Sequence, residues 1–312
     1  MNHMQVTCSK CNNEAVYLRR YTGERLCRDC MVNTTIDRVR KTINAQQMLR
    51  EDDRIAVAIS GGKDSAVLLD VLHKIERRYP HAELVPLTID EGILGYRDKA
   101  LEAARRLSSS LTLSLEVYSF KELFGNTLDE IIDARGDDAL GACSYCGVLR
   151  RYALNMAAKD LNADVVTTGH NLDDESQTIL MNILRGESIR ISRTSRRRED
   201  SIEGFVPRVK PLTEISERDI VAYSYHLMLP YHDVPCPYAS EAYRNDVRNF
   251  LNKMEYERPG TLLAVLRSGE SIANMVTQES RSIEFSECIE CGEPTPSVLC
   301  KACQMLKEIR GE

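Results

Sequence analysis

A glycine-rich segment, Ser60-Gly61-Gly62-Lys63-Asp64-Ser65, directly follows the apolar run Ile55–Ile59. The order predicts a buried strand, a tight turn and then a helix. Glycine lets the backbone approach a phosphate closely, a helix N-terminus offers free N–H groups, and Lys63 adds a cation. A Walker A loop needs Gly at the place of Val57 and Ser or Thr at the place of Asp64, so that motif is excluded. The segment is therefore either a different phosphate-binding loop or an ordinary strand–turn–helix.

Eight of the eleven cysteines form two sets of paired CxxC motifs near opposite ends of the chain. In each set, two turns can bring four thiolates to tetrahedral positions, as in structural zinc sites. Disulfides do not suit a cytosolic chain, and four thiolates leave zinc no open position. We therefore expect two structural zinc ions, one bound by Cys8, Cys11, Cys27 and Cys30 and one by Cys288, Cys291, Cys300 and Cys303.

Three cysteines remain once both quartets are assigned: Cys143, Cys146 and Cys236. The first two form a third CxxC, and the last stands between two prolines. One interpretation is a redox CxxC and an unrelated buried cysteine. The other is a 4Fe-4S cluster with one iron that has no protein ligand. The spacing alone leaves both open.

Strands and helices are expected to alternate through the middle of the chain, which predicts an α/β domain with a parallel sheet covered on both faces. Ligands of such sheets bind at the carboxyl ends of the strands. Three glycine-containing turns fall there: Ser60–Ser65, Asp90-Glu91-Gly92 and Gly169-His170-Asn171. The expected strands are 54–60, 84–90, 113–120 and 164–168, and the expected helices are 64–79, 96–107, 123–134, 147–161 and 173–184.

The composition shifts along the chain predict four parts. Residues 1–32 form the first zinc module, 33–50 a linker helix, 51–285 the catalytic domain, and 286–312 the second zinc module. Within the catalytic domain, the Arg-rich stretch 186–204 is expected to be a mobile loop, and 216–227, 240–256 and 261–275 are expected to be helical.

The net charge of -6 excludes a uniformly basic nucleic-acid binder, but the charge is uneven. Residues 1–50 hold nine Lys or Arg against four Asp or Glu, and residues 185–210 hold eight against four. Either region can be a solvated surface or a contact for a polyanion. The chain has no apolar run of about 18 residues and no signal peptide, so we expect a cytoplasmic protein and no membrane partner.

Four segments together carry a resemblance to a known family. They are Ser60–Ser65, which resembles the SGGxDS loop of PP-loop ATP pyrophosphatases, and three more: Cys143–Arg151, Thr168–Glu175, and Cys236-Pro-Tyr with Tyr243-Arg244. With the cysteine quartets, they make the chain similar, from Cys8 to Cys303, to the PP-loop tRNA 2-thiouridine synthetases. The resemblance implies the Rossmann-like PP-loop fold.

The resemblance also implies a reaction. Such enzymes use ATP to adenylate the C2 oxygen of a tRNA uridine, release pyrophosphate, and replace the oxygen with sulfur while AMP departs. It implies that Ser60, Gly61, Gly62, Lys63, Asp64 and Ser65 hold the phosphates together with Mg²⁺, and that Ala58, Ile89 and Gly169 meet the nucleotide. Asp174 stands near the α-phosphate, unless it and Asp173 only cap a helix.

In this family the three remaining cysteines bind a 4Fe-4S cluster, which implies the same for Cys143, Cys146 and Cys236. A cysteine persulfide is the alternative sulfur carrier. Some relatives have a catalytic lysine four residues after the second of these cysteines, where this chain has Arg150. Arginine can hold a phosphate but cannot shuttle a proton, so the role expected of Arg150 is electrostatic.

The expected partners also follow from the resemblance. They are tRNA, a sulfur donor (a ubiquitin-like thiocarboxylate protein or sulfide) and a second copy of the chain. The expected tRNA contacts are Arg19, Arg20, Arg25 and Arg28 and the stretch Arg190–Arg198. Cys143–Arg151 and Asn182–Gly186 favour the wobble uridine over the T-loop uridine. The alternatives are a tRNA 2-thiocytidine synthetase and a zinc-ribbon RNA-binding scaffold with a vestigial ATP site.

Overall fold

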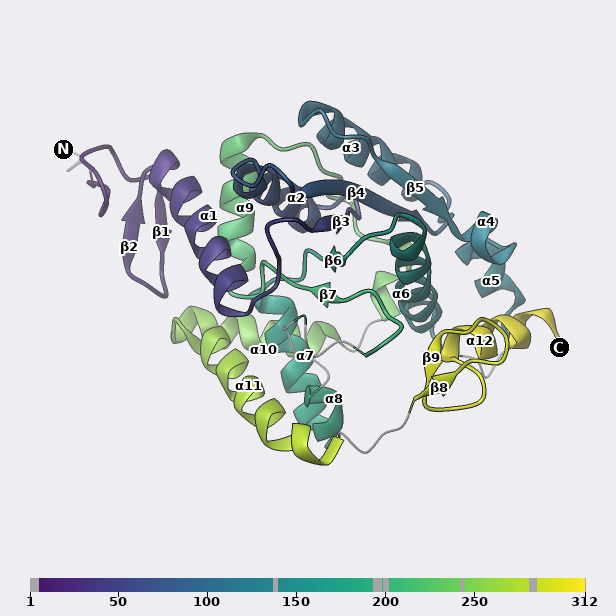
Figure 1. Ribbon diagram of the computed structural model, residues 1–312. Coiled ribbons are helices and arrows are strands. Elements are labelled where there is room, and N and C mark those ends of the chain that lie inside the picture. The colour runs from purple at the N-terminus through teal and green to yellow at the C-terminus, as the bar shows by residue number, and fades with distance from the viewer. Residues whose placement is uncertain are drawn as a thin grey trace.

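The structure is a computed structural model that describes residues 6–136, 140–192, 198, 202–241, 244–280 and 285–311. Its centre is a five-stranded parallel sheet in the order β5-β4-β3-β6-β7 (Figure 1). The strands are β3 (Arg54–Ala58), β4 (Glu83–Asp90), β5 (Glu116–Ser119), β6 (Val165–Thr167) and β7 (Arg208–Val209). The sheet confirms the expected α/β fold class.

The strand order contains one reversal, between β3 and β6. From β3 the chain moves outward through β4 to β5, and it then returns to place β6 on the other side of β3. Crevices at the carboxyl ends of strands that flank such a reversal are the usual ligand sites of open parallel sheets. Ser60–Ser65 follows β3, and Gly169–Asn171 follows β6. The fold therefore brings two of the three expected turns together at this reversal.

Helices cover both faces of the sheet. Ile55 and Val57 of β3 belong to a core cluster formed with α1 (Arg28–Ala45), α2 (Lys63–Glu76), α3 (Arg97–Ser110) and α9 (Glu217–Leu227). Ala56, between them, belongs to a second cluster formed with α4 (Phe120–Phe124), α5 (Leu128–Ala134) and α6 (Ala142–Asp160). Since alternate residues of a strand face opposite sides, β3 is buried on both faces.

Several expected boundaries were wrong. Helix α6 begins at Ala142 rather than at residue 147, so the CxxC lies in its first turns. The expected helix 123–134 is two helices separated at Gly125, whose φ of 84° is left-handed. Stretch 186–204 contains the helix α8 (Ser188–Ser192), which packs against α11 (Thr261–Ser280), so it is not wholly a loop. Residues 193–197 and 199–201 lie outside the described residues.

A module lies at each end of the molecule (Figure 1). The N-terminal module contains the hairpin β1 (Tyr17–Arg19) and β2 (Glu24–Leu26), and α1 runs from it onto the central α/β domain. The C-terminal module contains β8 (Ser286–Glu287), β9 (Pro294–Thr295) and α12 (Lys301–Arg310). The remaining elements are α7 (Leu172–Leu184), the 3-10 helix η2 (Pro237–Glu241) and α10 (Arg244–Glu257). None of the described helices has the length and apolarity to cross a membrane.

Candidate active site

The turn Ser60–Ser65 leads from β3 into α2 with Gly62 at the N-cap position. Its serines close it internally: the Ser65 hydroxyl donates to the Gly62 carbonyl at 2.9 Å and lies 3.1 Å from the Ser60 hydroxyl. Gly61 has a φ of 88°, and a Cβ there would lie 2.3 Å from the Ala100 carbonyl oxygen. Only glycine therefore fits this position. The loop presents the N-terminus of α2, where N–H groups suit an anion.

A buried arginine, Arg97, is hydrogen-bonded to this loop, and the sequence did not predict this contact. Arg97 donates to the carbonyl oxygens of Ser60 at 2.7 Å and of Ile89 at 2.5 Å. It also donates to the Thr88 hydroxyl at 2.6 Å. One guanidinium thus joins the carboxyl ends of β3 and β4. An arginine in an amphipathic helix carries no local signal of burial, which is why only the structure reveals it.

The loop after β6 lies against the first loop. A Cβ on Gly169 would stand 3.0 Å from the carbonyl carbon of Asp64 and from the backbone nitrogen of Ser65. The Asn171 amide donates to the Asp64 carboxylate at 2.8 Å. Two sequence segments more than 100 residues apart therefore form one surface, and Gly169 allows their close approach.

The two neighbouring carboxylates of α7 have different surroundings. Asp174 forms a capping box with Asn171 and lies 3.5 Å from Arg244, and burial raises its pKa. Asp173 accepts the backbone N–H of Glu217 at 2.8 Å, so it caps α9. Burial also raises the pKa of Asp173, to about 6. Asn171 links Asp174 to the first loop, because it donates to the carboxylates of both Asp174 and Asp64, while Asp173 faces α9.

Lys63 is held rather than free. Its ammonium lies 2.7 Å from Glu217 and 3.2 Å from Asp64, and these charges raise its pKa although burial lowers it. Ala58 is the last residue of β3, and Ile89 is buried near the end of β4. Both therefore lie at the strand ends where the sequence placed them.

The three central cysteines come from α6 and from the segment just before η2. Cys143 and Cys146 lie in the first two turns of α6, and the Cys143 thiol is 3.5 Å from the Tyr238 carbonyl in η2. Cys146 and Cys236 pack on one apolar cluster. Burial raises the pKa of Cys146 to about 11, against the charge of Arg150 and together with the charges of Glu91 and the other two cysteines.

The spacing of these three sulfurs tests which group they fit. Among the described residues, the two terminal quartets are the groups whose ligand atoms lie within 4.8 Å of one another. The central cysteines are more widely spaced. In a 4Fe-4S cluster each thiolate binds a different iron, so its sulfurs stand further apart than the ligands of a single ion. Three thiols with this wider spacing are a donor set that a 4Fe-4S cluster can use.

A short segment connects the cysteines to the first loop. The backbone N–H of His232 donates to the Gly61 carbonyl at 2.8 Å, and Cys236 follows four residues later. Four residues of extended chain span at most about 14 Å. Arg150, one turn after Cys146, lies 3.6 Å from Glu91. A short segment that is hydrogen-bonded to the loop thus leads to Cys236.

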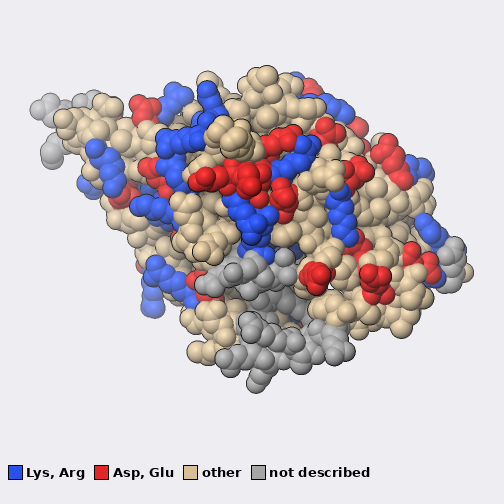
Figure 2. Space-filling view, in the orientation of Figure 1, with Lys and Arg blue, Asp and Glu red and all other residues tan. Residues whose placement is uncertain are grey.

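Positive and negative side chains are interspersed on the face that Figure 2 shows, so no single-sign field covers it. Of the expected tRNA contacts, Arg19 was wrong: it is 1% exposed and pairs with Asp219 at 3.0 Å. Arg198 pairs with Asp53 at 2.6 Å, and Arg190 pairs with Glu187. Arg193, Arg196, Arg197 and Tyr243 lie outside the described residues. Arg25 and Arg28 are exposed, while Arg20 stacks over the Tyr256 ring.

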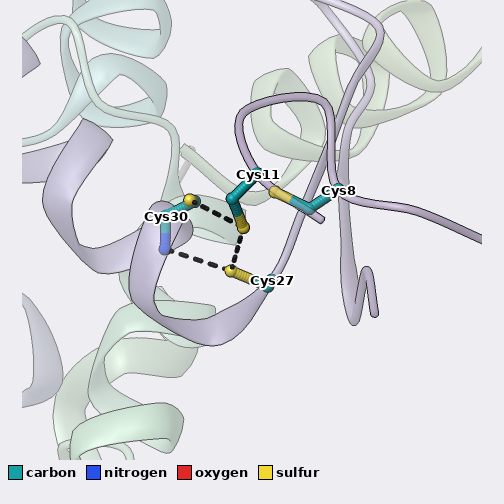
Figure 3. A group of neighbouring side chains, drawn as sticks. All are labelled: Cys8, Cys11, Cys27 and Cys30. Carbon is teal, nitrogen blue, oxygen red and sulfur yellow. Dashed lines mark hydrogen bonds between the residues drawn. The ribbon is translucent and has the colours of Figure 1, made fainter. Parts of the chain in front are cut away.

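Each terminal quartet is arranged around a common centre (Figure 3, for the N-terminal one). Cys11 lies 3.6 Å from both Cys27 and Cys30, and Cys291 lies 3.6 Å from Cys300. Ligands about 2.3 Å from a tetrahedral ion lie about 3.8 Å apart, so the quartets fit one zinc ion each. Although burial opposes it, backbone N–H groups lower the pKa of Cys8 to about 6, which favours the metal-binding thiolate.

Known proteins resemble this chain over most of its length. A profile for the PP-loop domain matches residues 31–255, and one for the N-terminal LIM domain of the 2-thiouridine synthetase TtuA matches residues 7–30. The Cytoplasmic tRNA 2-thiolation protein 1 of Drosophila melanogaster is 39% identical over 97% of this chain and 88% of its own. The tRNA 2-thiolation protein NcsA of Haloferax volcanii is 36% identical over 97% and 98%.

A solved structure is similar as well. It is the U34-tRNA thiolase NcsA from Methanococcus maripaludis with its 4Fe-4S cluster, with a TM-score of 0.85 and 30% identity. The match covers 97% of this chain and 96% of that one.

Proposed function

Because this chain belongs to the PP-loop family of tRNA 2-thiolation proteins, we propose that it is an ATP-dependent tRNA sulfurtransferase that forms 2-thiouridine. The finer steps of the proposal are adenylation of the uridine C2 oxygen, release of pyrophosphate, and replacement of that oxygen by sulfur. The wobble uridine is the proposed target, because the archaeal structural relative is a U34-tRNA thiolase.

One observation carries the proposal: the segment that leads to Cys236 lies against the phosphate-type loop. The His232–Gly61 hydrogen bond holds the segment that leads to Cys236 against the loop. A vestigial ATP site would not need Gly61 at a position that only glycine fits. In the proposed reaction, one bound uridine is therefore reached both by ATP at the loop and by sulfur at the cysteines.

In the first half of the reaction, the adenylation of uridine, several residues of the chain have separate roles. The backbone of Ser60, Gly61 and Gly62 and the N-terminus of α2 bind the phosphates, with Ser65 holding the loop closed. Lys63 and Asp64 would flank them, and a Mg²⁺ ion held there would offset the charge of the phosphates. Ala58, Ile89 and Gly169 accommodate the nucleotide at the strand ends. Asp174, the carboxylate beside Asp64, acts as a metal ligand or proton acceptor near the α-phosphate.

The second half needs a sulfur nucleophile. Cys143, Cys146 and Cys236 would hold a 4Fe-4S cluster, whose free iron supplies a site for a sulfide ligand. Arg150 stays positively charged between the thiols and the nucleotide, where it stabilises the negative charge of the activated oxygen and the phosphate. The sulfur donor is a ubiquitin-like thiocarboxylate protein or sulfide.

The remaining parts of the proposal concern assembly. The quartets hold two zinc ions, and the four-part division 1–32, 33–50, 51–285 and 286–312 describes the zinc modules, linker and catalytic domain. Exposed Arg25 and Arg28 contact tRNA phosphates. We propose a homodimer because the chain resembles this family. We propose a cytoplasmic location because the Drosophila relative is named a cytoplasmic protein.

The direct test uses anaerobically purified protein, ATP, sulfide and unmodified tRNA. Mass spectrometry of the digested tRNA should find 2-thiouridine, and metal analysis should find about four irons and about two zincs per chain. Alanine at Cys143, Cys146 or Cys236 should remove iron and thiolation while zinc remains. Ser144→Ala, in the same turn, is the matched control. Thiolation that survives one of the cysteine variants would exclude that cysteine, and 2-thiocytidine would identify the other enzyme class.

A further inference from the structure

We propose that Glu91 is a positioning residue that orients the Arg150 guanidinium between the phosphate loop and the cysteine site. This inference rests on the proposed function, since it assigns a partner to one of its residues. It concerns a carboxylate that the reaction described above does not use.

Glu91 is a buried carboxylate, 5% exposed, that lies directly after β4. Its two oxygens face two different arginines. Oε2 is 2.9 Å from the Arg97 Nε, and Oε1 is 3.6 Å from an Arg150 terminal nitrogen. A buried side chain that contacts two cations in this way constrains their relative positions.

The two arginines serve different parts of the site. Arg97 holds the Ser60 carbonyl of the phosphate loop and is itself almost fully buried. Its Nε–H does not point at Glu91, so the contact between them is electrostatic rather than a hydrogen bond. Arg97 is therefore fixed by its bonds to the strand ends, and Glu91 is fixed by Arg97 and by the Leu128 N–H bond to its carbonyl at 2.7 Å.

Arg150, unlike Arg97, is not fixed by burial. Half of its side chain is exposed, and among the described residues Glu91 is the acidic group that forms an ion pair with it. Without Glu91, a long exposed guanidinium would sample many rotamers, and its favourable placement would be lost.

The test is a double-mutant cycle of Glu91→Gln and Arg150→Gln. It measures tRNA-dependent pyrophosphate release by the cluster-free protein, so it does not require the loaded enzyme. Each single variant should lower the rate about tenfold to a hundredfold, as misplacement of a catalytic group does. The double variant should be no slower than Arg150→Gln, because Glu91 acts through Arg150. Additive losses would overturn the inference.

The controls separate positioning from loss of fold. Asp70→Asn removes another buried carboxylate with a lysine partner, Lys74 at 2.6 Å, away from the loop, and should leave the rate unchanged. If Glu91→Gln does not fold, Glu91→Asp, which withdraws the carboxylate by one methylene, enters the same cycle.

A second readout requires no activity. Urea unfolding of the same four proteins gives the change in midpoint caused by each substitution. If the two side chains interact, the change in the double variant should differ from the sum of the changes in the single variants. Equality of the two would overturn the contact. If the wild-type protein releases no pyrophosphate with any tRNA, the proposed function fails while the unfolding cycle still tests the contact. If the wild-type protein is active and the rate cycle is additive, only the role of Glu91 fails.

Discussion

The guanidinium of Arg19 in β1 is paired with the carboxylate of Asp219 in α9 at 3.0 Å, and both side chains are essentially inaccessible to water. The Tyr21 hydroxyl donates to the other Asp219 oxygen at 2.6 Å, and Arg19 also donates to the hydroxyls of Thr34 and Thr35. A buried, fully bonded ion pair thus joins the N-terminal zinc module to the helix whose first residue, Glu217, contacts Lys63.

We expect Arg19→Met to destabilise the protein by about 3 kcal/mol, because it leaves a buried carboxylate without its cation. Urea unfolding of the zinc-loaded protein measures this loss. Arg25→Met, at an exposed arginine of the same hairpin, should change stability by less than about 0.5 kcal/mol. Equal effects of the two substitutions would mean that the buried pair does not dock the module.

Glycine is required at Gly61 but not at Gly62. Gly61→Ala should destabilise the protein by more than about 1 kcal/mol and abolish ATP binding, because the added Cβ meets the Ala100 carbonyl and the backbone is left-handed. At Gly62 the φ is -86° and the nearest atom to a Cβ is 3.5 Å away, so Gly62→Ala should keep its stability. Calorimetric unfolding compares them, and an equally unstable Gly62→Ala would contradict the steric explanation.

The fold class and the main site segments could be predicted because their signals are local. The apolar run before Ser60 and the glycines after it identify a strand and a loop without knowledge of the rest of the chain. The CxxC spacings likewise bring ligands together over a few residues. These features depend on neighbours in sequence, which a linear pattern records.

The features that were missed depend on contacts between distant segments. Arg19 resembles the other arginines of its basic region, and only Asp219, 200 residues later, makes it a buried residue. Arg97 looks like a surface residue of an amphipathic helix. Strand β7 has two residues, too few for any periodicity, and pairs with β6 through the sheet. Helix α6 starts after Gly141, which offers no side-chain cap to mark its beginning.

The neighbouring residues Asp173 and Asp174 should respond differently to the same isosteric change. Asp174→Asn should abolish tRNA-dependent pyrophosphate release, because it removes the charge beside Asp64 at the nucleotide site. Asp173→Asn retains an oxygen that can accept the Glu217 N–H, so its activity should stay within about threefold of wild type. Pyrophosphate assays at saturating tRNA distinguish them. If Asp174→Asn retains full activity, the carboxylate only caps α7.

Arg25 and Arg28 should contribute to tRNA affinity in a salt-dependent way. Replacing both with Gln should weaken binding and reduce the slope of log affinity against log salt by about 1.5 to 2, the value for two lost phosphate contacts. Filter binding at several salt concentrations measures the slope. Arg106→Gln, at an exposed arginine of α3 paired with Glu102, should leave it unchanged. An unaltered slope in the double variant would leave the N-terminal hairpin as a solvated surface.

Stability should fall with rising pH because of Glu76, a buried carboxyl near the end of α2. Burial, and secondly the charge of Asp53, raise its pKa from 4.5 to about 7. The folded state therefore holds a proton that the unfolded state releases more easily. The resulting stabilisation is complete below about pH 4.5 and is lost as the pH rises through about 7.

Glu76→Gln removes this titration while it keeps the shape of the side chain. Between pH 6 and pH 8, the wild type should lose about 1 kcal/mol of stability relative to the variant. Urea unfolding of both proteins at the two pH values measures the difference, and the comparison cancels any pH effect on zinc binding that they share. His81→Gln, at an exposed position in the loop after α2, should follow the wild-type curve above pH 7. A constant difference between wild type and Glu76→Gln at both pH values would show that Glu76 titrates normally.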